Sequence, residues 1–399
     1  MERWKDTGDE EVAQGTPLSP PQTPQLESAV ERRERWRSVY VIYFTMFQMS
    51  LGFSIVLTGV WPYLDKLEPG AQKEVLGVAV GANPLGQLVF SPLLGLWANR
   101  SGSVRAPLLT TLVLFVVASV MYAQLHLTRP HAMYYMVFAR FLVGVSSEKE
   151  ALKSLKPDAV SSWTLVVAFF VLVFNFVLLE TLATSLTMDQ FAWSKREALE
   201  YMGALMSAGA VVACVTFAMI GPLTKLFEER ALLLWGGFLL TGMASILCIP
   251  WGPGPPPLAP VNATEAGGGC PQASQPWCAD SRGLNVSQFL AGYACISVGY
   301  SLGVTLIQTI FSKVLGPRPQ GVWMGVLTGA GCLSRALGPV FVSYVYARHG
   351  PDATFGTTAA LTLAALATLR IVYNRLKPPP LTQIQAQREL VSLKRNDDT

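Results

Sequence analysis

The chain has 399 residues, of which 51% are hydrophobic and only 14% are charged, against roughly 25% charged residues in an average soluble protein. This composition excludes a disordered chain, a nucleic-acid-binding protein and most soluble enzymes, and the net charge of +4 is too small to indicate a class of partner. Between Tyr40 and Tyr373, apolar stretches of about 17–26 residues alternate with short polar loops. A bilayer core about 30 Å thick needs about 20 such residues per helix, so the sequence predicts an all-α polytopic membrane protein.

In chain order, the apolar stretches predict about ten membrane spans, at residues 39–60, 75–97, 107–125, 131–147, 163–187, 200–220, 231–250, 287–311, 322–347 and 354–374. They fall into two groups, with four spans before residue 148 and six spans after residue 162. The expected organisation is a disordered cytosolic tail at 1–38, a partial N-terminal bundle of four spans at 39–147, a short cytosolic linker at 148–162, a C-terminal six-helix bundle at 163–374 with a large luminal loop at 251–286, and a cytosolic tail at 375–399.

Three observations predict that both termini are cytosolic. Of the 30 Lys and Arg residues, 20 then fall in cytosolic segments and 7 in the opposite loops, as the positive-inside tendency requires. The loop 251–286 contains two glycosylation sequons, at Asn262 and Asn285, which can be used only on the luminal side. The same loop holds Cys270 and Cys278, a pair suited to a disulfide in an oxidising compartment.

The loop after the second span carries glycines that permit a tight turn and arginines that can cap helix ends. It contains Gly95, Asn99, Arg100, Gly102 and Arg105. This loop resembles the signature G-x-x-x-D-R-x-G-x-R of the major facilitator superfamily. Asn99 occupies the acidic position of that signature here. An asparagine can form a hydrogen bond at this position but not the ion pair of an aspartate.

A diluted copy of the loop follows the sixth predicted span, with Gly221 and Arg230 at its ends. Two such loops, each after the second helix of a half, imply the tandem repeat of this superfamily. More narrowly, the chain resembles a lysosomal member of the superfamily through several short segments, which include Trp36-Arg37-Ser38, Trp61-Pro62-Tyr63-Leu64, Trp277-Cys278 and Gly316-Pro317-Arg318-Pro319-Gln320-Gly321.

The resemblance breaks at 148–162, where the family has a fifth helix, a sixth helix and a central cytosolic loop. The resemblance then implies that the predicted spans correspond to helices one to four and seven to twelve, so that the first half is incomplete and the second half is full, as in a truncated splice form or a degenerate paralogue. Without the missing fifth helix, the small-residue face at Gly299 and Gly303 is expected to meet lipid or another chain, which favours self-association, misfolding or retention in the endoplasmic reticulum.

Charges inside a bilayer are costly and mark a function or a buried pair. Arg140 resembles a fourth-helix arginine of the superfamily, and Glu180 lies at a matching depth in the seventh-helix counterpart, so an Arg140–Glu180 contact is expected either as a gate or as a structural pair. Arg335 lies near the middle of its span and is expected to brace packing or to add positive potential to an anion path. Gln48 and Asn175 are weaker candidates, as pathway-lining or helix-packing residues.

The sequence contains no catalytic constellation and no metal-spaced His/Cys cluster, so no enzyme activity, metal or cofactor is predicted. The leading interpretation is a transporter-like protein of the lysosomal or endosomal membrane that moves a small solute or ion by alternating access. The alternatives are an anion (chloride) channel and a truncated, non-transporting product. The expected partners are the lipid bilayer and the solute, with no nucleic acid.

Overall fold

The computed structural model describes residues 30, 32–41, 43–45, 47–48, 82–90, 93, 97, 105–125, 132–145, 158–258, 269–272, 275–316 and 320–377. Within these residues the secondary structure is helical, apart from one isolated β-bridge between Leu258 and Cys270. The predictions for most of the N-terminal tail, for the linker before residue 158 and for the tail after residue 377 lie outside the described residues. The chain forms two compact units, Met1–Val60 and Trp61–Thr399, which are described separately.

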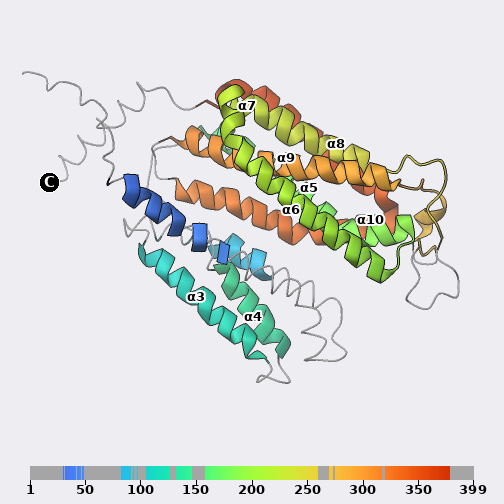
Figure 1. Cartoon of the computed structure of the whole chain (residues 1–399), viewed down its shortest axis with the longest axis horizontal. Helices are drawn as coiled ribbons and strands as arrows, with labels where there is room; N and C mark the ends of the chain where they lie inside the picture. Colours follow the sequence, from blue (N-terminus) through green and yellow to red (C-terminus); the bar gives the residue numbers. More distant parts are fainter. Residues whose placement is uncertain are drawn as a thin grey trace, which may run out of the picture. The chain divides into compact units, whose positions relative to one another are not determined.

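The second unit begins, in its longer described stretches, with α3 (Arg105–Ala123) and α4 (Ala132–Val145). These two apolar helices pack against each other (Figure 1). Helix α3 corresponds to the third predicted span. Helix α4 corresponds to the fourth, which is predicted at 131–147.

The following helices form the C-terminal bundle. They are α5 (Ala159–Phe191), α6 (Lys195–Leu226), α7 (Glu229–Leu232), the π-helix η2 (Leu233–Leu239), α8 (Leu240–Leu247), α9 (Val286–Leu315) and α10 (Gly321–Val372). Among the described residues, five helical stretches are long and apolar enough to cross a membrane, and α7, η2 and α8 together make one of them. The protein is therefore an all-helical, multi-span membrane protein.

The ends of these helices follow from local sequence. Ser194 and Glu197 form a capping box that starts α6, since each side chain hydrogen-bonds the backbone N–H of the other residue. Gly350 interrupts α10 because its φ of 75° is a left-handed conformation that a helix cannot contain. The two arms of α10 on either side of Gly350 correspond to the last two predicted spans, 322–347 and 354–374.

Helix α5 is the centre of the bundle and packs against α6, α8, α9 and α10 (Figure 1). Its central residues are buried on most of its circumference, and Leu165, Leu172, Leu178 and Leu186 have at most 1% of their surface exposed. Helix α6 differs, since most of its apolar side chains are exposed. In a membrane protein such a face is compatible with contact to lipid.

The expected exposure of Gly299 and Gly303 is wrong. Both glycines are buried inside the C-terminal bundle. A Cβ atom on Gly299 would lie 2.7 Å from the Thr241 hydroxyl and 3.0 Å from the Gly237 carbonyl oxygen, and one on Gly303 would lie 2.5 Å from Leu172 Cδ2. The two glycines permit α9 to approach its neighbours closely within the bundle, so neither of them lies on an open face of the bundle.

Candidate functional site

Three polar side chains meet on neighbouring helices of the C-terminal bundle. Glu180 on α5 interacts electrostatically with Arg335 on α10, and both charged groups lie within electrostatic range of the Tyr300 side chain on α9. The Tyr300 ring stacks on Phe176, one turn before Glu180, with ring centroids 4.0 Å apart. Residues Glu180, Tyr300 and Arg335 are called the C-bundle cluster below.

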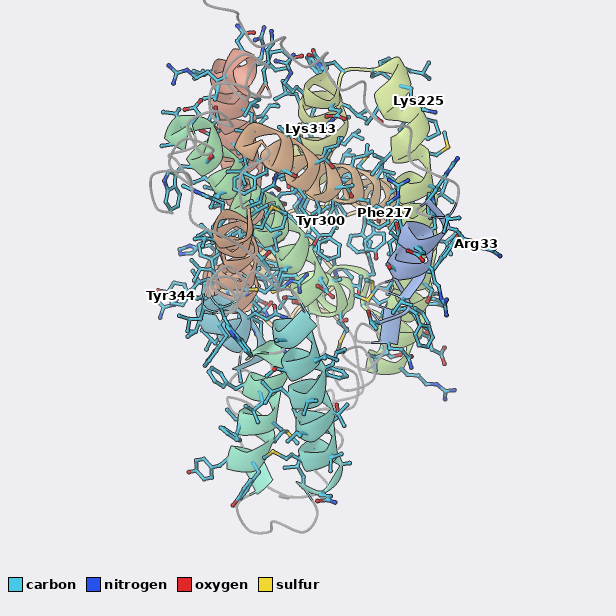
Figure 2. All side chains as sticks on the ribbon, turned by 90° about the vertical axis from the view of Figure 1, so that its left-hand side faces the viewer. Arg33, Phe217, Lys225, Tyr300, Lys313 and Tyr344 are labelled. Carbon is cyan, nitrogen blue, oxygen red and sulfur yellow. A yellow bond between two sulfur atoms is a disulfide. The ribbon has the colours of Figure 1, made fainter. Side chains whose placement is uncertain are left out.

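The C-bundle cluster lies deep along its helices. At 1.5 Å of rise per residue, Glu180 is about 16 Å from the end of α5 at Phe191, and Arg335 is about 22 Å from the break at Gly350. Glu180 and Arg335 are both exposed to the outside of the folded chain, whereas Tyr300 is half-buried and lies within the bundle (Figure 2). The cluster therefore places a carboxylate and a guanidinium on an open face, far from the helix ends.

The hydroxyl of Tyr293 extends the cluster along α9. Tyr293 lies within electrostatic range of Glu180, and its ring and hydroxyl lie against Gly209 of α6, where a Cβ atom would come within 2.9 Å of the hydroxyl. Sequence reasoning missed both tyrosines. Their seven-residue spacing, which repeats on one face of a helix, is the signal that could have identified them.

Asn175 has a different place from the other candidates. Its amide nitrogen donates to the Thr358 carbonyl at 3.2 Å and to the Thr362 hydroxyl, and its amide oxygen accepts from the Ser245 hydroxyl at 2.9 Å. All these groups are buried between α5, α8 and α10. Asn175 is therefore buried in hydrogen bonds between helices in this structure, and its role in a pathway stays a prediction.

The expected Arg140–Glu180 contact stays a prediction. Arg140 is in helix α4, but its side chain lies outside the described residues. Gln48 is exposed on the helical segment of the first unit. In the described bundle, the arginine that interacts with Glu180 is Arg335.

The loop motif of the first half also lies largely outside the described residues. This applies to Gly95, Asn99, Arg100 and Gly102, while Arg105 begins α3 with a side chain that is not described. Of the diluted second copy, Gly221 lies in α6, where a Cβ atom would meet open space. Arg230 lies in α7, at the beginning of the next span.

Arg230 connects the N-terminal end of the span formed by α7, η2 and α8 to the C-terminal end of α10. Its guanidinium donates to the Tyr373 carbonyl at 3.0 Å, lies 4.6 Å from the centre of the Tyr373 ring and forms an ion pair with Glu228. Tyr373 donates to Glu228 at 2.6 Å, and beside this group Lys313 of α9 pairs with Glu229 at 2.5 Å. Figure 2 shows Lys225 and Lys313 toward the same end of the bundle. These contacts connect α7, α9 and α10 at their predicted cytosolic ends.

The predicted luminal loop packs against the other end of the C-terminal bundle. Cys270 and Cys278 form a disulfide, and Trp277 packs edge-on against Tyr346 of α10 with centroids 5.2 Å apart. Tyr346 in turn donates to Asp189, near the end of α5, at 2.9 Å. Asn285 is exposed directly before α9, whereas Asn262 lies outside the described residues.

No protein-family model matches the sequence. The chain is similar to the major facilitator superfamily domain-containing protein 8 of Xenopus laevis, with 29% identity over 482 residues, covering 88% of this chain and 94% of the relative. A solved structure, that of the human organic anion transporter TETRAN, aligns with 79% of this chain and 90% of its own, at 17% identity and a TM-score of 0.45.

The alignment with the Xenopus relative contains large gaps on the side of this chain. Since 88% of this chain is only about 350 residues, an alignment over 482 residues includes more than about a hundred positions of the relative that have no counterpart here. The resemblance found from short sequence segments is therefore confirmed over nearly the whole chain, with substantial gaps.

Proposed function

We propose that this multi-pass membrane protein, which is similar to the major facilitator superfamily domain-containing protein 8 of Xenopus laevis, is a transporter of that superfamily and moves a small solute or ion across an endolysosomal membrane by alternating access. In this proposal both termini are cytosolic, and the loop 251–286 is luminal. The lysosomal or endosomal location is proposed from the resemblance alone, and the substrate is left at the level of a small solute or ion.

The C-bundle cluster is the observation that carries the proposal. Glu180 and Arg335 lie deep along apolar helices and are exposed to the outside of the folded bundle. If that face met lipid, each charged side chain would cost about 2.5–3.5 kcal/mol near the centre of the bilayer. A water-containing pathway along α5, α9 and α10 removes this cost, so an aqueous pathway is the environment that best explains an exposed carboxylate and guanidinium at this depth.

The cluster also has the chemistry of a gate. A carboxylate, a guanidinium and a phenol on three helices can exchange partners when the helices move, because each group can hydrogen-bond either to its neighbours or to a solute. Arg335 supplies positive potential for an anionic group, and Glu180 can bind a proton or a cation. Transport then couples occupancy of the cluster to the relative position of the helices that carry it.

The test is a current measurement on the full chain in proteoliposomes. Chloride and a panel of organic anions and amino acids serve as probes, with and without proton and voltage gradients. We expect a gradient-dependent current with at least one probe, reduced at least tenfold in Glu180→Gln. The control Val215→Ala changes an exposed apolar residue of α6 and should leave the current unchanged. A probe current that Glu180→Gln does not reduce would remove the cluster from the mechanism.

The second candidate is an anion channel, favoured by the exposed guanidinium of Arg335. A channel predicts chloride currents that follow the chloride gradient alone, need no coupling gradient and are lost in Arg335→Gln. The same recordings therefore separate the two candidates.

A third candidate is a non-transporting product, favoured by the unmatched positions in the alignment with the Xenopus relative. Alternating access needs two comparable halves, and an incomplete first half favours self-association or retention in the endoplasmic reticulum. This candidate predicts protein that carries only immature glycans and gives no current with any probe.

A further inference from the structure

The helical segment of the first unit carries a face that combines arginines with aromatic residues. Counted from Arg33, the face follows the spacing i, i+3, i+4, i+7 and i+11, which places Arg33, Trp36, Arg37, Tyr40 and Phe44 along one side of a helix. Together with Val41 these side chains line one open hollow. They are called the arginine–aromatic face below.

The residues of this face are ordered by polarity along the helix. Arg33 comes first, and Trp36 and Arg37 follow it as neighbours in the chain. Tyr40 comes one turn later, and the ring centroids of Trp36 and Tyr40 are 5.9 Å apart. Val41 and Phe44 complete the face and lie within the first predicted span, 39–60. All of them are exposed, with 44% of Trp36 and 63% of Phe44 accessible.

This order matches the depth profile of one membrane leaflet. Guanidinium groups hydrogen-bond phosphate oxygens with two parallel bonds and remain charged at any physiological pH. Trp and Tyr prefer the interfacial region, and valine and phenylalanine side chains prefer the hydrocarbon region. A free phosphate ion would use only the two arginines, whereas a phospholipid would use the whole face.

Two further arginines of the same segment provide an internal comparison. At about 100° per residue, Arg35 lies on the opposite side of the helix from Arg37 and Arg33, and Arg32 lies about 100° away from Arg33. Arg32 and Arg35 carry the same charge in the same stretch and do not line the hollow. A general attraction of basic residues to an acidic membrane would use all four arginines equally.

We propose that the arginine–aromatic face binds one anionic phospholipid, with its phosphate between Arg33 and Arg37 and its glycerol and first methylene groups along Trp36, Tyr40, Val41 and Phe44. The site is formed by residues of the first unit alone, and its occupation does not depend on transport. It makes the first helix a point at which the lipid composition of the membrane acts on the protein.

The experiment is a binding titration on the full chain in a neutral detergent. The probe is a fluorescent short-chain phosphatidylserine, followed by fluorescence anisotropy. We compare Arg33→Gln/Arg37→Gln with the matched variant Arg32→Gln/Arg35→Gln, which removes the same charge from the other sides of the helix. Unlabelled phosphatidylcholine and inorganic phosphate serve as competitors, and gel filtration verifies that each variant is folded.

We expect Arg33→Gln/Arg37→Gln to weaken binding roughly thirty-fold, at the strength typical of two basic residues near an anionic membrane surface. The matched variant should weaken binding less than about three-fold, and Phe44→Ser should weaken binding without changing the charge. Equal weakening by the two arginine pairs would overturn the proposal in favour of unspecific attraction. Displacement by inorganic phosphate as effective as displacement by unlabelled phosphatidylserine would show a free-anion site and would also overturn it.

Discussion

Replacing Gly299 by alanine tests the close approach of α9 to the span formed by α7, η2 and α8. The added Cβ atom would lie 2.7 Å from the Thr241 hydroxyl and 3.0 Å from both the Gly237 carbonyl oxygen and the Thr241 backbone nitrogen. Two of these three atoms belong to the backbone and cannot rotate away. The helices must therefore separate locally, and overpacking of this kind costs about 1–3 kcal/mol.

The substitution also has a favourable effect that must be separated from this cost. Alanine is more stable than glycine inside a helix by about 1 kcal/mol, and this gain partly hides the steric loss. Gly356 provides the matched control, because it lies in the helical second arm of α10 and a Cβ atom there would meet nothing within 4 Å. Gly356→Ala has the helical gain without the collision, so the difference between the two variants isolates the overpacking cost.

Thermal unfolding of the purified full chain in detergent, followed by tryptophan fluorescence, measures this difference. At about 1 °C per kcal/mol for a protein of this size, Gly299→Ala should melt about 1–4 °C below Gly356→Ala. Gly356→Ala should melt at or slightly above the unsubstituted chain. Equal melting temperatures for the two variants would refute the close approach at Gly299.

Three further predictions concern the polar contacts. Asn175→Ala and Thr362→Val should show a coupling of about 0.6–1.7 kcal/mol in a double-mutant cycle of unfolding, and additive effects would contradict their hydrogen bond. Arg230→Lys should destabilise the chain nearly as much as Arg230→Ala, because the guanidinium reaches the Tyr373 carbonyl and Glu228 with two different nitrogens that a single ammonium does not replace; full retention of stability by lysine would contradict this. Cys270→Ser/Cys278→Ser should remove about 2–3 kcal/mol of loop stability, and limited proteolysis should then cleave within 251–286 sooner than in the unsubstituted chain.

The spans of the C-terminal bundle could be predicted from the sequence to within a few residues. The predicted span 163–187 lies inside α5, and 287–311 lies inside α9. Hydropathy determines these segments because each must fill the bilayer with apolar side chains. The hydropathy pattern does not show the π-helical stretch Leu233–Leu239, because the change from i→i+4 to i→i+5 hydrogen bonds leaves the apolar composition unchanged.

The partners of the charged residues could be predicted only in part. Glu180 and Arg335 are visible in the sequence as rare charges within apolar segments, but their mutual interaction and the Tyr300 contact depend on the rotation of three helices about their axes. Hydropathy carries little information about rotation when a helix is apolar on all sides, as α5 is. For the same reason Gly299 and Gly303 could not be assigned to the interior of the bundle from their spacing alone.

The central claim is that water reaches the C-bundle cluster, and the reactivity of a cysteine at position 180 tests it most directly. Cys214, Cys248, Cys295 and Cys332 are first replaced by alanine, and Glu180→Cys is compared with Val215→Cys, which is also exposed and lies on the apolar face of α6. Both variants are treated in proteoliposomes with a charged, membrane-impermeant thiol reagent, which reacts only with a thiolate in water. We predict that position 180 reacts at least tenfold faster than position 215. Equal rates, or no reaction at position 180, would contradict an aqueous pathway through the bundle.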